Sequence, residues 1–431
     1  MLDCPSRQDA TGKRNEVPLP GSGGRRPFIS VATREYEMQL SRFLGIKALS
    51  FAGLLCLAAA AQAADPVRIG YSMSLTGIFA QAAPSQVNGY ELWKEQVNAQ
   101  GGLDVAGVKR MMEFVSYDDQ SNPANAVRIY EKLITQDKVD LLIAPWGTSM
   151  HIAIAPVLSR YKFPMVGNTA ASVSLRDIGP GYIWFPASEI PDRFGAQLAE
   201  FMHGQGIKKA AVVASELPFA QEIKKFLVPV LANAGIELAV NENYPPDIKD
   251  MTSLLKLVSI AKPDAVIALS YPSDSFLFAN QARELKIDAP FVFSLVGPTF
   301  SAYLNAFGNK VDGIVTLGAW SPNQSAWPLA KPFFDAYVKR FKEIPDASDT
   351  VLAYSSLEIL QQAVAKAGLD KEKLREAISS GTFDTINGPI KFKGVENVIT
   401  PTAFLQIQNG ALELVWPTSI KTSDFRPKKG W

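Results

Sequence analysis

The strongest constraint on the fold is an alternation of short apolar runs with amphipathic segments, which begins at Val67 and recurs along most of the chain. VRIGYSM precedes the helical pattern NGYELWKEQVNAQ, and MMEFVSYDD precedes ANAVRIYEKLITQD. Apolar strands that alternate with helices and end at Gly or Pro are typical of parallel βαβ units. The sequence therefore predicts an α/β fold with parallel sheets.

The same alternation starts again after a break around residues 183–191. AAVVAS, DAVIALS and FVFSL are predicted strands with amphipathic stretches between them, and VDGIVTLGAW closes the series. We therefore expect two doubly wound, Rossmann-like lobes in succession. The roughly 367 residues from Asp65 onward are also too many for a single hydrophobic core.

Two late helical patterns, KPFFDAYVKRFKE and TVLAYSSLEILQQAVAKAG, have no strands of their own, so we expect them to pack on the first lobe. Asn409-Gly410 lies between two alternating apolar runs and predicts a β-hairpin on the second lobe. The chain would then cross between the lobes three times, which predicts a hinge with a ligand cleft beside it. The expected lobes are residues 65–186 with 321–383 and residues 187–320 with 384–431.

Residues 38–64 have the features of a secretory signal peptide, with a basic start, an apolar core and small residues that predict cleavage near Ala63 or Ala64. The apolar core is shorter than the span of about 20 residues that a bilayer requires. Residues 1–37 are expected to be disordered or to reflect a misassigned start, with Met38 as the true first residue. The sequence thus predicts an exported, soluble protein.

The charge balance argues against a nucleic-acid partner. Residues 1–63 hold 8 of the 43 lysines and arginines and 5 of the 42 aspartates and glutamates, so the exported part is close to neutral. Cys4 and Cys56 both precede the predicted cleavage site. We therefore expect no disulfide and no thiol chemistry in the exported protein.

Patterns typical of metal sites and catalysis are missing from the sequence. The two histidines are far apart, and Asp118-Asp119 lacks the ligand spacing of a calcium loop. Ser149 and His151 are two residues apart, whereas helix neighbours lie three or four apart, and no Gly-x-Ser-x-Gly occurs. We expect His151 at a helix surface or end and His203 in a last helical turn. Because neither a P-loop nor a dinucleotide motif follows a strand, we expect no cofactor and no enzyme activity.

Two corners rich in small residues follow neighbouring predicted strands. We call APWGTS (144–149) the first corner and GNTAAS (167–172) the second corner. Gly147 permits a close turn, and Thr148 and Ser149 begin a helix whose free N–H groups can hold an anion. Plain capping of this helix by Thr148 is the alternative. Because both corners should face one cleft, the pattern favours binding of an anion such as a carboxylate.

Aromatic residues are predicted at strand ends on both sides of this cleft. Trp146 precedes the helix of the first corner, and Phe219 and Tyr271 occupy matching positions in the second lobe. Each aromatic residue alone is as well explained by core packing. Together they suggest a cleft with an apolar wall.

Several stretches, in this order, resemble the periplasmic solute-binding proteins of the branched-chain amino acid ABC transporter class, which have the type I periplasmic binding fold. They are IGYSMSLTG, NGYELWKEQVNAQGG, VSYDDQSNP, LIAPWGTSM, PMVGNTAAS, DAVIALSYPSD and GPIKFK. The resemblance implies a periplasmic protein that closes around its ligand by a hinge motion. It also implies that the corners hold a carboxylate through Thr148, Ser149, Thr169, Ala171 and Ser172, and that Phe219 and Tyr271 close the second lobe over it.

The chain departs from this family where amino acid binders hold the ligand's ammonium group. The matching positions are Ile190 and Leu295, so Leu295 is expected to face the ligand in place of an acid. An unpaired buried charge would cost about 1 to 3 kcal/mol or more. We therefore favour an aromatic or apolar organic acid without an ammonium group over a branched-chain or other amino acid. Glu189, Asp192 and Glu216 are neighbouring acids that leave the second possibility open.

The resemblance implies a partner in the inner membrane, the permease of an ABC importer, to which a monomeric binding protein delivers its ligand. A sensory receptor that uses the same fold to regulate another protein is the alternative from a different functional class. An exported hydrolase would need a catalytic constellation that the sequence lacks.

Overall fold

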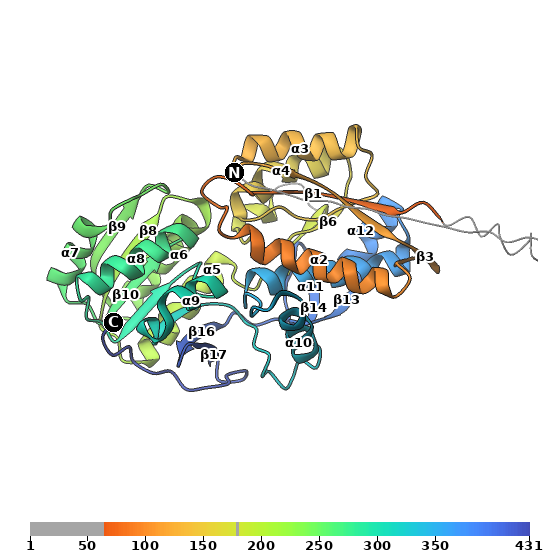
Figure 1. Cartoon of the computed structure of the whole chain (residues 1–431). Coiled ribbons are helices and arrows are strands. Elements are labelled where there is room, and N and C mark those ends of the chain that lie inside the picture. Colours follow the sequence, from red (N-terminus) through yellow and green to blue (C-terminus); the bar gives the residue numbers. More distant parts are fainter. Residues whose placement is uncertain (1–63, 178–180) are drawn as a thin grey trace, which may run out of the picture. The chain divides into compact units, whose positions relative to one another are not determined.

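The computed structural model describes residues 64–177 and 181–431. The expected upstream segment, nearly all of the expected signal peptide, Cys4 and Cys56 lie outside the described residues. Within the described part, strands and helices alternate as the sequence predicts (Figure 1). No helix in these two ranges is both long enough and apolar enough to cross a membrane.

The first sheet has β1 (Val67–Met73) at its centre, flanked in parallel by β4 (Met112–Asp118) and β5 (Leu141–Leu142). Helices α2 (Ala83–Ala99), α3 (Pro123–Thr135) and α4 (Thr148–Arg160) follow these strands. β1 is almost continuously buried because helices cover a parallel sheet on both faces. Gly70 at its centre allows α3 to pack closely, since a Cβ atom there would lie 2.9 Å from a side-chain methyl of Leu133 and would force that side chain to shift.

Smaller elements complete the surroundings of the first sheet. They are β2 (Leu103–Val105), β3 (Val108–Arg110), β6 (Met165–Val166), β7 (Ile183–Trp184) and the short 3-10 helix η1 (Val173–Arg176). β2 and β3 form a hairpin, and β6 pairs with β7 in parallel.

The second sheet has the strand order β17-β16-β12-β11-β10-β8-β9. Its parallel strands are β8 (Lys209–Ser215), β9 (Glu237–Tyr244), β10 (Ala265–Leu269), β11 (Phe291–Ser294) and β12 (Ile314–Leu317). Helices between and beside these strands are α5 (Pro191–Gly204), α6 (Pro218–Asn233), α7 (Thr252–Ala261), α8 (Pro272–Glu284), α9 (Ser301–Phe307) and η2 (Gly308–Val311).

The predicted hairpin at Asn409-Gly410 is confirmed. β16 (Phe404–Gln408) and β17 (Ala411–Trp416) pair antiparallel, and β16 also pairs with β12, which extends the second sheet. Asn409 and Gly410 have φ values of 55° and 76°. Positive φ at both central residues is the conformation of a two-residue hairpin turn, which Asn-Gly adopts at low cost.

A cluster of aromatic rings packs this hairpin against α5 and β11. Phe404 of β16 lies at ring-centroid distances of 5.3 Å from Phe194 and 5.6 Å from Phe201, both on α5. It also lies 6.2 Å from Phe293 of β11 and 5.3 Å from Trp416 of β17. Because Phe404 is fully buried, the second lobe depends on a strand that the chain adds near its end.

The two late helices that the sequence predicts pack against α2, and a third helix, which was not predicted, packs against the second of them. They are α10 (Ala330–Phe341), α11 (Asp349–Ala367) and α12 (Lys371–Ser380). α2 and α11 lie side by side (Figure 1), and Trp93 of α2 donates a hydrogen bond of 2.8 Å to Gln361 of α11. Arg340 of α10 forms an ion pair of 2.8 Å with Glu95 of α2.

Three segments connect the two lobes. Hydrogen bonds join two of them, the one that contains Pro186 and Ser188 and the one that contains Asn397 and Thr402. β13 (Thr382–Thr385), β14 (Gly388–Lys393) and β15 (Glu396–Asn397) form a small antiparallel sheet. Asn397 donates to the carbonyl of Pro186 (2.9 Å), and Thr402 donates to the carbonyl of Ser188 (2.7 Å). The pairing of β13 with β14 runs across the lobe limit expected at residue 384, and the exact limits stay a prediction.

Candidate functional site

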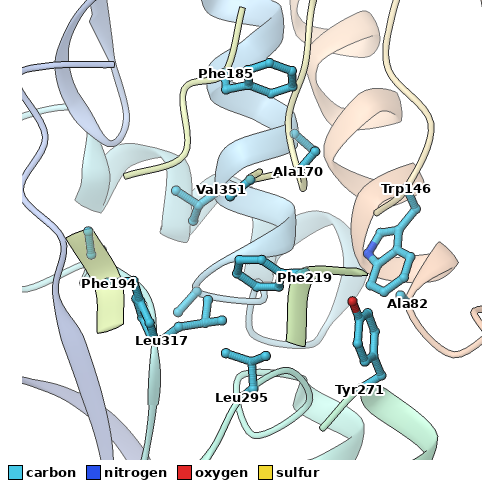
Figure 2. Packing of buried hydrophobic residues seen from close by; sticks show 14 of the residues in the cluster. Ala82, Trp146, Ala170, Phe185, Phe194, Phe219, Tyr271, Leu295, Leu317 and Val351 are labelled. Atoms are coloured by element: carbon cyan, nitrogen blue, oxygen red, sulfur yellow. The ribbon is translucent and has the colours of Figure 1, made fainter. Parts of the chain in front are cut away.

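A small pocket of about 40 Å³ lies where the two corners meet the strand ends of the second sheet (Figure 2). Both corners, one connecting segment, the second sheet and the start of α11 contribute to it. The lining residues are Trp146, Gly147, Thr148, Thr169, Ala170, Ala171, Ala187, Glu189, Phe219, Tyr271, Val296, Leu317, Ser348, Asp349 and Leu352. The site thus collects residues that are more than two hundred positions apart in the chain.

The structure brings most of the expected site residues together. Those that line the pocket are Trp146, Thr148, Thr169, Ala171, Phe219 and Tyr271. Ser149, Ser172 and Leu295 lie outside its lining. Ser149 is partly buried in α4, and Ser172 donates a hydrogen bond of 2.8 Å to Glu222.

Leu295 is fully buried, and the adjacent Val296 contributes to the pocket instead. Both residues lie directly beyond β11, where the chain is still hydrogen-bonded to the neighbouring strand end through Ala268 and Ser270. Successive residues of extended chain point to opposite sides. Val296 therefore lines the pocket in place of the expected Leu295, and its side chain is also apolar.

The first corner presents an uncapped helix start to the pocket. Gly147 is the N-cap of α4, with φ 82° and ψ 154°, a conformation that glycine adopts without strain. No side chain caps this helix. Thr148 is its first residue rather than its cap, so the capping alternative is not what the structure shows. The first-turn N–H groups retain the partial positive charge that attracts anions.

Hydrogen bonds hold the two corners in a fixed relation. The backbone N–H of Gly147 donates to the hydroxyl of Thr169 (2.9 Å), and the N–H of Ala171 donates to the hydroxyl of Thr148 (3.3 Å). Thr169 in turn lies within 3.3 Å of the Gln86 side-chain oxygen. The hydroxyl groups and the helix start therefore form one preorganised end of the pocket.

His151 lies between the two corners, and the prediction of a position at a helix surface or end is met only in part, because the residue lies near the start of α4 but not at its surface. The side chain is fully buried. Its Nδ1 lies 2.8 Å from the Gly147 carbonyl oxygen, and Asn168 donates its backbone N–H to Nε2 over 3.4 Å. Burial lowers the pKa of His151 to about 4, so the ring is neutral at physiological pH. This pattern requires the proton on Nδ1.

Replacing His151 with phenylalanine keeps a ring in place but removes both hydrogen-bonding nitrogens. We expect the free energy of unfolding to fall by about 1 to 3 kcal/mol, because buried backbone groups lose partners. Ligand affinity should fall as well, since the corners are no longer joined. Urea unfolding and calorimetry measure the two effects. His203→Phe is the matched control, because His203 is exposed at the end of α5, and an equal effect there would contradict the assignment.

Trp146, Phe219 and Tyr271 supply the aromatic wall of the pocket, and Phe79 packs against Trp146 without being part of the lining. Trp146 lies 4.9 Å from Phe79 and 6.3 Å from Tyr271 between ring centroids, and the hydroxyl of Tyr271 points toward the Trp146 side (Figure 2). Asp274 accepts the backbone N–H of Tyr271 (3.0 Å) and the hydroxyl of Tyr244 (2.6 Å), which orients Tyr271. Phe79 was not expected from the sequence, because it lies in a loop without periodicity.

Two buried carboxyl groups also line the pocket. Glu189 was only an open possibility in the sequence, and Asp349 at the start of α11 was not expected at all. Each of these residues is only 5% exposed. Trp146 donates its indole N–H to Asp349 Oδ2 (2.6 Å), and Ser188 donates its backbone N–H to Glu189 Oε2 (2.9 Å). Burial raises the pKa of both groups above the usual range.

The geometry suits capture of a small molecule. One end offers hydroxyl and backbone N–H donors, the wall is aromatic, and carboxyl groups lie beside it. The two sides touch, since Ser273 donates to the carbonyl of Ile78 over 3.3 Å and Val173 donates to Glu222 over 3.2 Å. A ligand between them would contact both lobes, which is the condition for stabilising a closed form.

Comparison with known proteins gives a consistent result. A family model described as periplasmic binding protein matches residues 66–411. The leucine-, isoleucine-, valine-, threonine-, and alanine-binding protein of Pseudomonas aeruginosa is 27% identical over 378 residues, which cover 82% of this chain and 91% of that protein.

Two solved structures share the fold. The substrate binding protein LivJ of Streptococcus pneumoniae, in complex with isoleucine, has a TM-score of 0.73 and 22% identity, covering 82% of this chain and all of that one (100%). A solute binding protein of R. palustris, in complex with benzoate, has a TM-score of 0.74 and 19% identity, covering 84% and 99%. At these identities the likeness establishes the fold and not the ligand.

Proposed function

Because the chain belongs to the periplasmic binding protein family, we propose that it captures a small carboxylate in the pocket between its lobes and delivers it to an ABC importer. Proteins of this family bind solutes for transporters and are not enzymes. The observation that carries the proposal is the pocket itself, in which an uncapped helix start and two hydroxyl groups face an aromatic wall. Thr148, Thr169 and Ala171 would hold the carboxylate.

We favour an aromatic or apolar organic acid without an ammonium group. Most of what the second lobe contributes to the pocket is uncharged, namely Ala187, Phe219, Tyr271, Val296 and Leu317, and Glu189 is the one acid among its lining residues. Leu295 and Ile190, at the positions where amino acid binders hold the ammonium, are buried and apolar. That a structural neighbour is described as a complex with benzoate supports this class of ligand.

A branched-chain or other amino acid is the second candidate, and the observation that favours it is Glu189. This carboxyl group lines the pocket. Glu189 is adjacent to Ile190 and is one of the neighbouring acids that left an amino acid ligand possible. Together with Asp349 it could pair with an ammonium group. The Pseudomonas relative and the isoleucine complex support this alternative.

The biological setting is also part of the proposal. We expect an exported monomer in the periplasm whose partner is the permease of an ABC importer in the inner membrane. The expected lobes would move as units around the three connecting segments. A sensory receptor of the same fold is the alternative, and a permease encoded beside this protein would favour transport.

A thermal-shift screen of the purified protein tests the ligand class. The compounds are benzoate, 3,4-dihydroxybenzoate, a branched 2-oxo acid, leucine and isoleucine. A ligand at about 100 times its Kd adds about 2.7 kcal/mol of stability, which a melting curve resolves. We expect stabilisation by the acids without an ammonium group. Stabilisation by leucine and isoleucine alone would overturn this class and assign Glu189 to an ammonium group.

A further inference from the structure

Three buried acids gather at or directly behind the lining of the pocket. Asp349 and Glu189 line the pocket, and Asp346 lies directly behind Asp349. Asp346 is 2% exposed, and its Oδ1 accepts the backbone N–H groups of Ser348 (2.8 Å) and Asp349. Its Oδ2 is buried without a hydrogen-bond partner. Asp349 accepts a side-chain hydrogen bond from Trp146. Glu189 accepts one from the backbone N–H of Ser188.

Cations that could neutralise these acids are scarce. Among residues 64–177 and 181–431, none of the three carboxylates forms an ion pair. The titratable groups that face Asp349 are Asp346 and Glu189, both acids. Arg193 of α5 acts on Glu189 from a distance, but its guanidinium lies 3.4 Å from Glu396. Unpaired buried charges are strongly unfavourable, so protons or a ligand must supply the missing positive charge.

The rest of the pocket is arranged for an anion. The helix start at Thr148 and the hydroxyl of Thr169 line the same small space as the two carboxyl groups. A carboxylate ligand would therefore bring another negative charge close to Asp349 and Glu189. In a desolvated site, like charges at short range cannot all remain ionised.

We propose that Asp349, together with Glu189, is a specificity-determining residue that couples capture of a carboxylate ligand to uptake of a proton. This inference rests on the proposed function. The proton comes from solvent and binds a carboxylate oxygen of Asp349 or Glu189, with no covalent bond to the ligand. The resulting O–H can donate a hydrogen bond to the ligand's oxygen. A ligand with an ammonium group would pair with the ionised carboxylate instead, and its capture would release a proton.

The coupling has a definite sign. Burial and the neighbouring acid raise the pKa of Asp349, and a bound anion raises it further. Above the pKa of the free protein, each coupled proton weakens binding of the anion by up to about tenfold per pH unit. An amino acid ligand would show the opposite dependence, with affinity that rises toward the same pKa.

Isothermal titration calorimetry with benzoate and with 3,4-dihydroxybenzoate tests the coupling in the wild-type protein. Titrations at one pH in buffers of different ionisation enthalpy count the protons exchanged, and the series covers pH 5.5 to 9. We expect net uptake of up to one proton, and a Kd that rises with pH. Binding without proton exchange at every pH would overturn the inference while leaving the proposed function intact. If neither acid binds, and leucine binds with proton release, the inference and the favoured ligand class both fail, and the second candidate, an amino acid, takes their place.

Asp349→Asn and Glu189→Gln identify the proton acceptor. Asparagine keeps a carbonyl oxygen for the Trp146 N–H but has no proton to gain, so we expect at least half of the uptake to vanish and the Kd to vary less with pH. Asp335→Asn, at an exposed position on α10, is the charge-matched control and should behave as wild type. Unchanged uptake in both pocket variants would overturn the assignment. Melting temperatures show whether each variant folds. If one variant does not fold, the number of protons taken up by the wild-type protein still tests the coupling.

Discussion

Thr148→Asp is expected to weaken carboxylate binding by at least about 100-fold, equivalent to about 2.8 kcal/mol. The substitution places a negative charge at the first residue of α4, in the lining of the pocket, and removes the hydroxyl that accepts the N–H of Ala171. The fold should survive, because an acid in the first turn of a helix interacts favourably with the helix dipole. Calorimetry with the acid that stabilises the protein best measures the loss.

Thr252→Asp is the matched control for this variant. Thr252 is likewise the first residue of its helix, α7, which borders the second sheet far from the pocket lining. We expect its affinity to stay within about threefold of wild type, since a charge outside the pocket lining is screened by solvent and salt. Equal losses in both variants would show that the effect is not local. Retained binding in Thr148→Asp would exclude the helix start as the carboxylate site.

Phe404→Ala is expected to lower the free energy of unfolding by about 3 to 5 kcal/mol. Phe404 is fully buried among rings from α5, β11 and β17, so truncation leaves a cavity and removes aromatic contacts on several sides. The loss is concentrated where the late hairpin joins the second sheet. Urea unfolding followed by circular dichroism measures it.

Ile260→Ala on α7 is the control for truncation of an apolar side chain. Ile260 is 79% exposed, so the change should cost less than about 0.5 kcal/mol. If Phe404→Ala costs no more than this surface variant, the aromatic cluster does not hold the hairpin. A second unfolding transition in Phe404→Ala would show that the lobes unfold separately.

The proposed ligand class depends on how the charges in the pocket are placed. The corners can hold any small carboxylate, so they do not distinguish an organic acid from an amino acid. On the proposal above, discrimination depends on Glu189 and Asp349, because ionised carboxylates repel a second negative charge and attract an ammonium group or a proton. The direction of proton exchange therefore distinguishes the two ligand classes.

Much of the fold followed from local patterns in the sequence. The alternation from Val67 onward predicts parallel α/β lobes because strand and helix periodicities depend on near neighbours. Asn409-Gly410 predicts its hairpin because both residues tolerate positive φ. The corner at Gly147 was also visible, since a strand, a glycine and hydroxyl residues in that order predict an exposed helix start.

The residues that only the tertiary structure identified reach the pocket from distant segments. His151 was expected at a helix surface or end, but it is buried between the corners, with Nδ1 hydrogen-bonded to the Gly147 carbonyl of the first corner and Nε2 to the Asn168 N–H of the second. Val296 rather than Leu295 lines the pocket because the direction of a side chain beyond a strand end depends on the backbone there.

The sequence by itself thus determined the fold class, the hairpin and the two corners, because each depends on residues that are close along the chain. Only the tertiary structure decided which side chains share the pocket. Asp349 is the clearest example, since it begins a helix some two hundred residues after Trp146 and meets it through a hydrogen bond that no local pattern encodes. Burial then raises the pKa of this carboxyl, and burial is a property of the assembled protein and not of the local sequence.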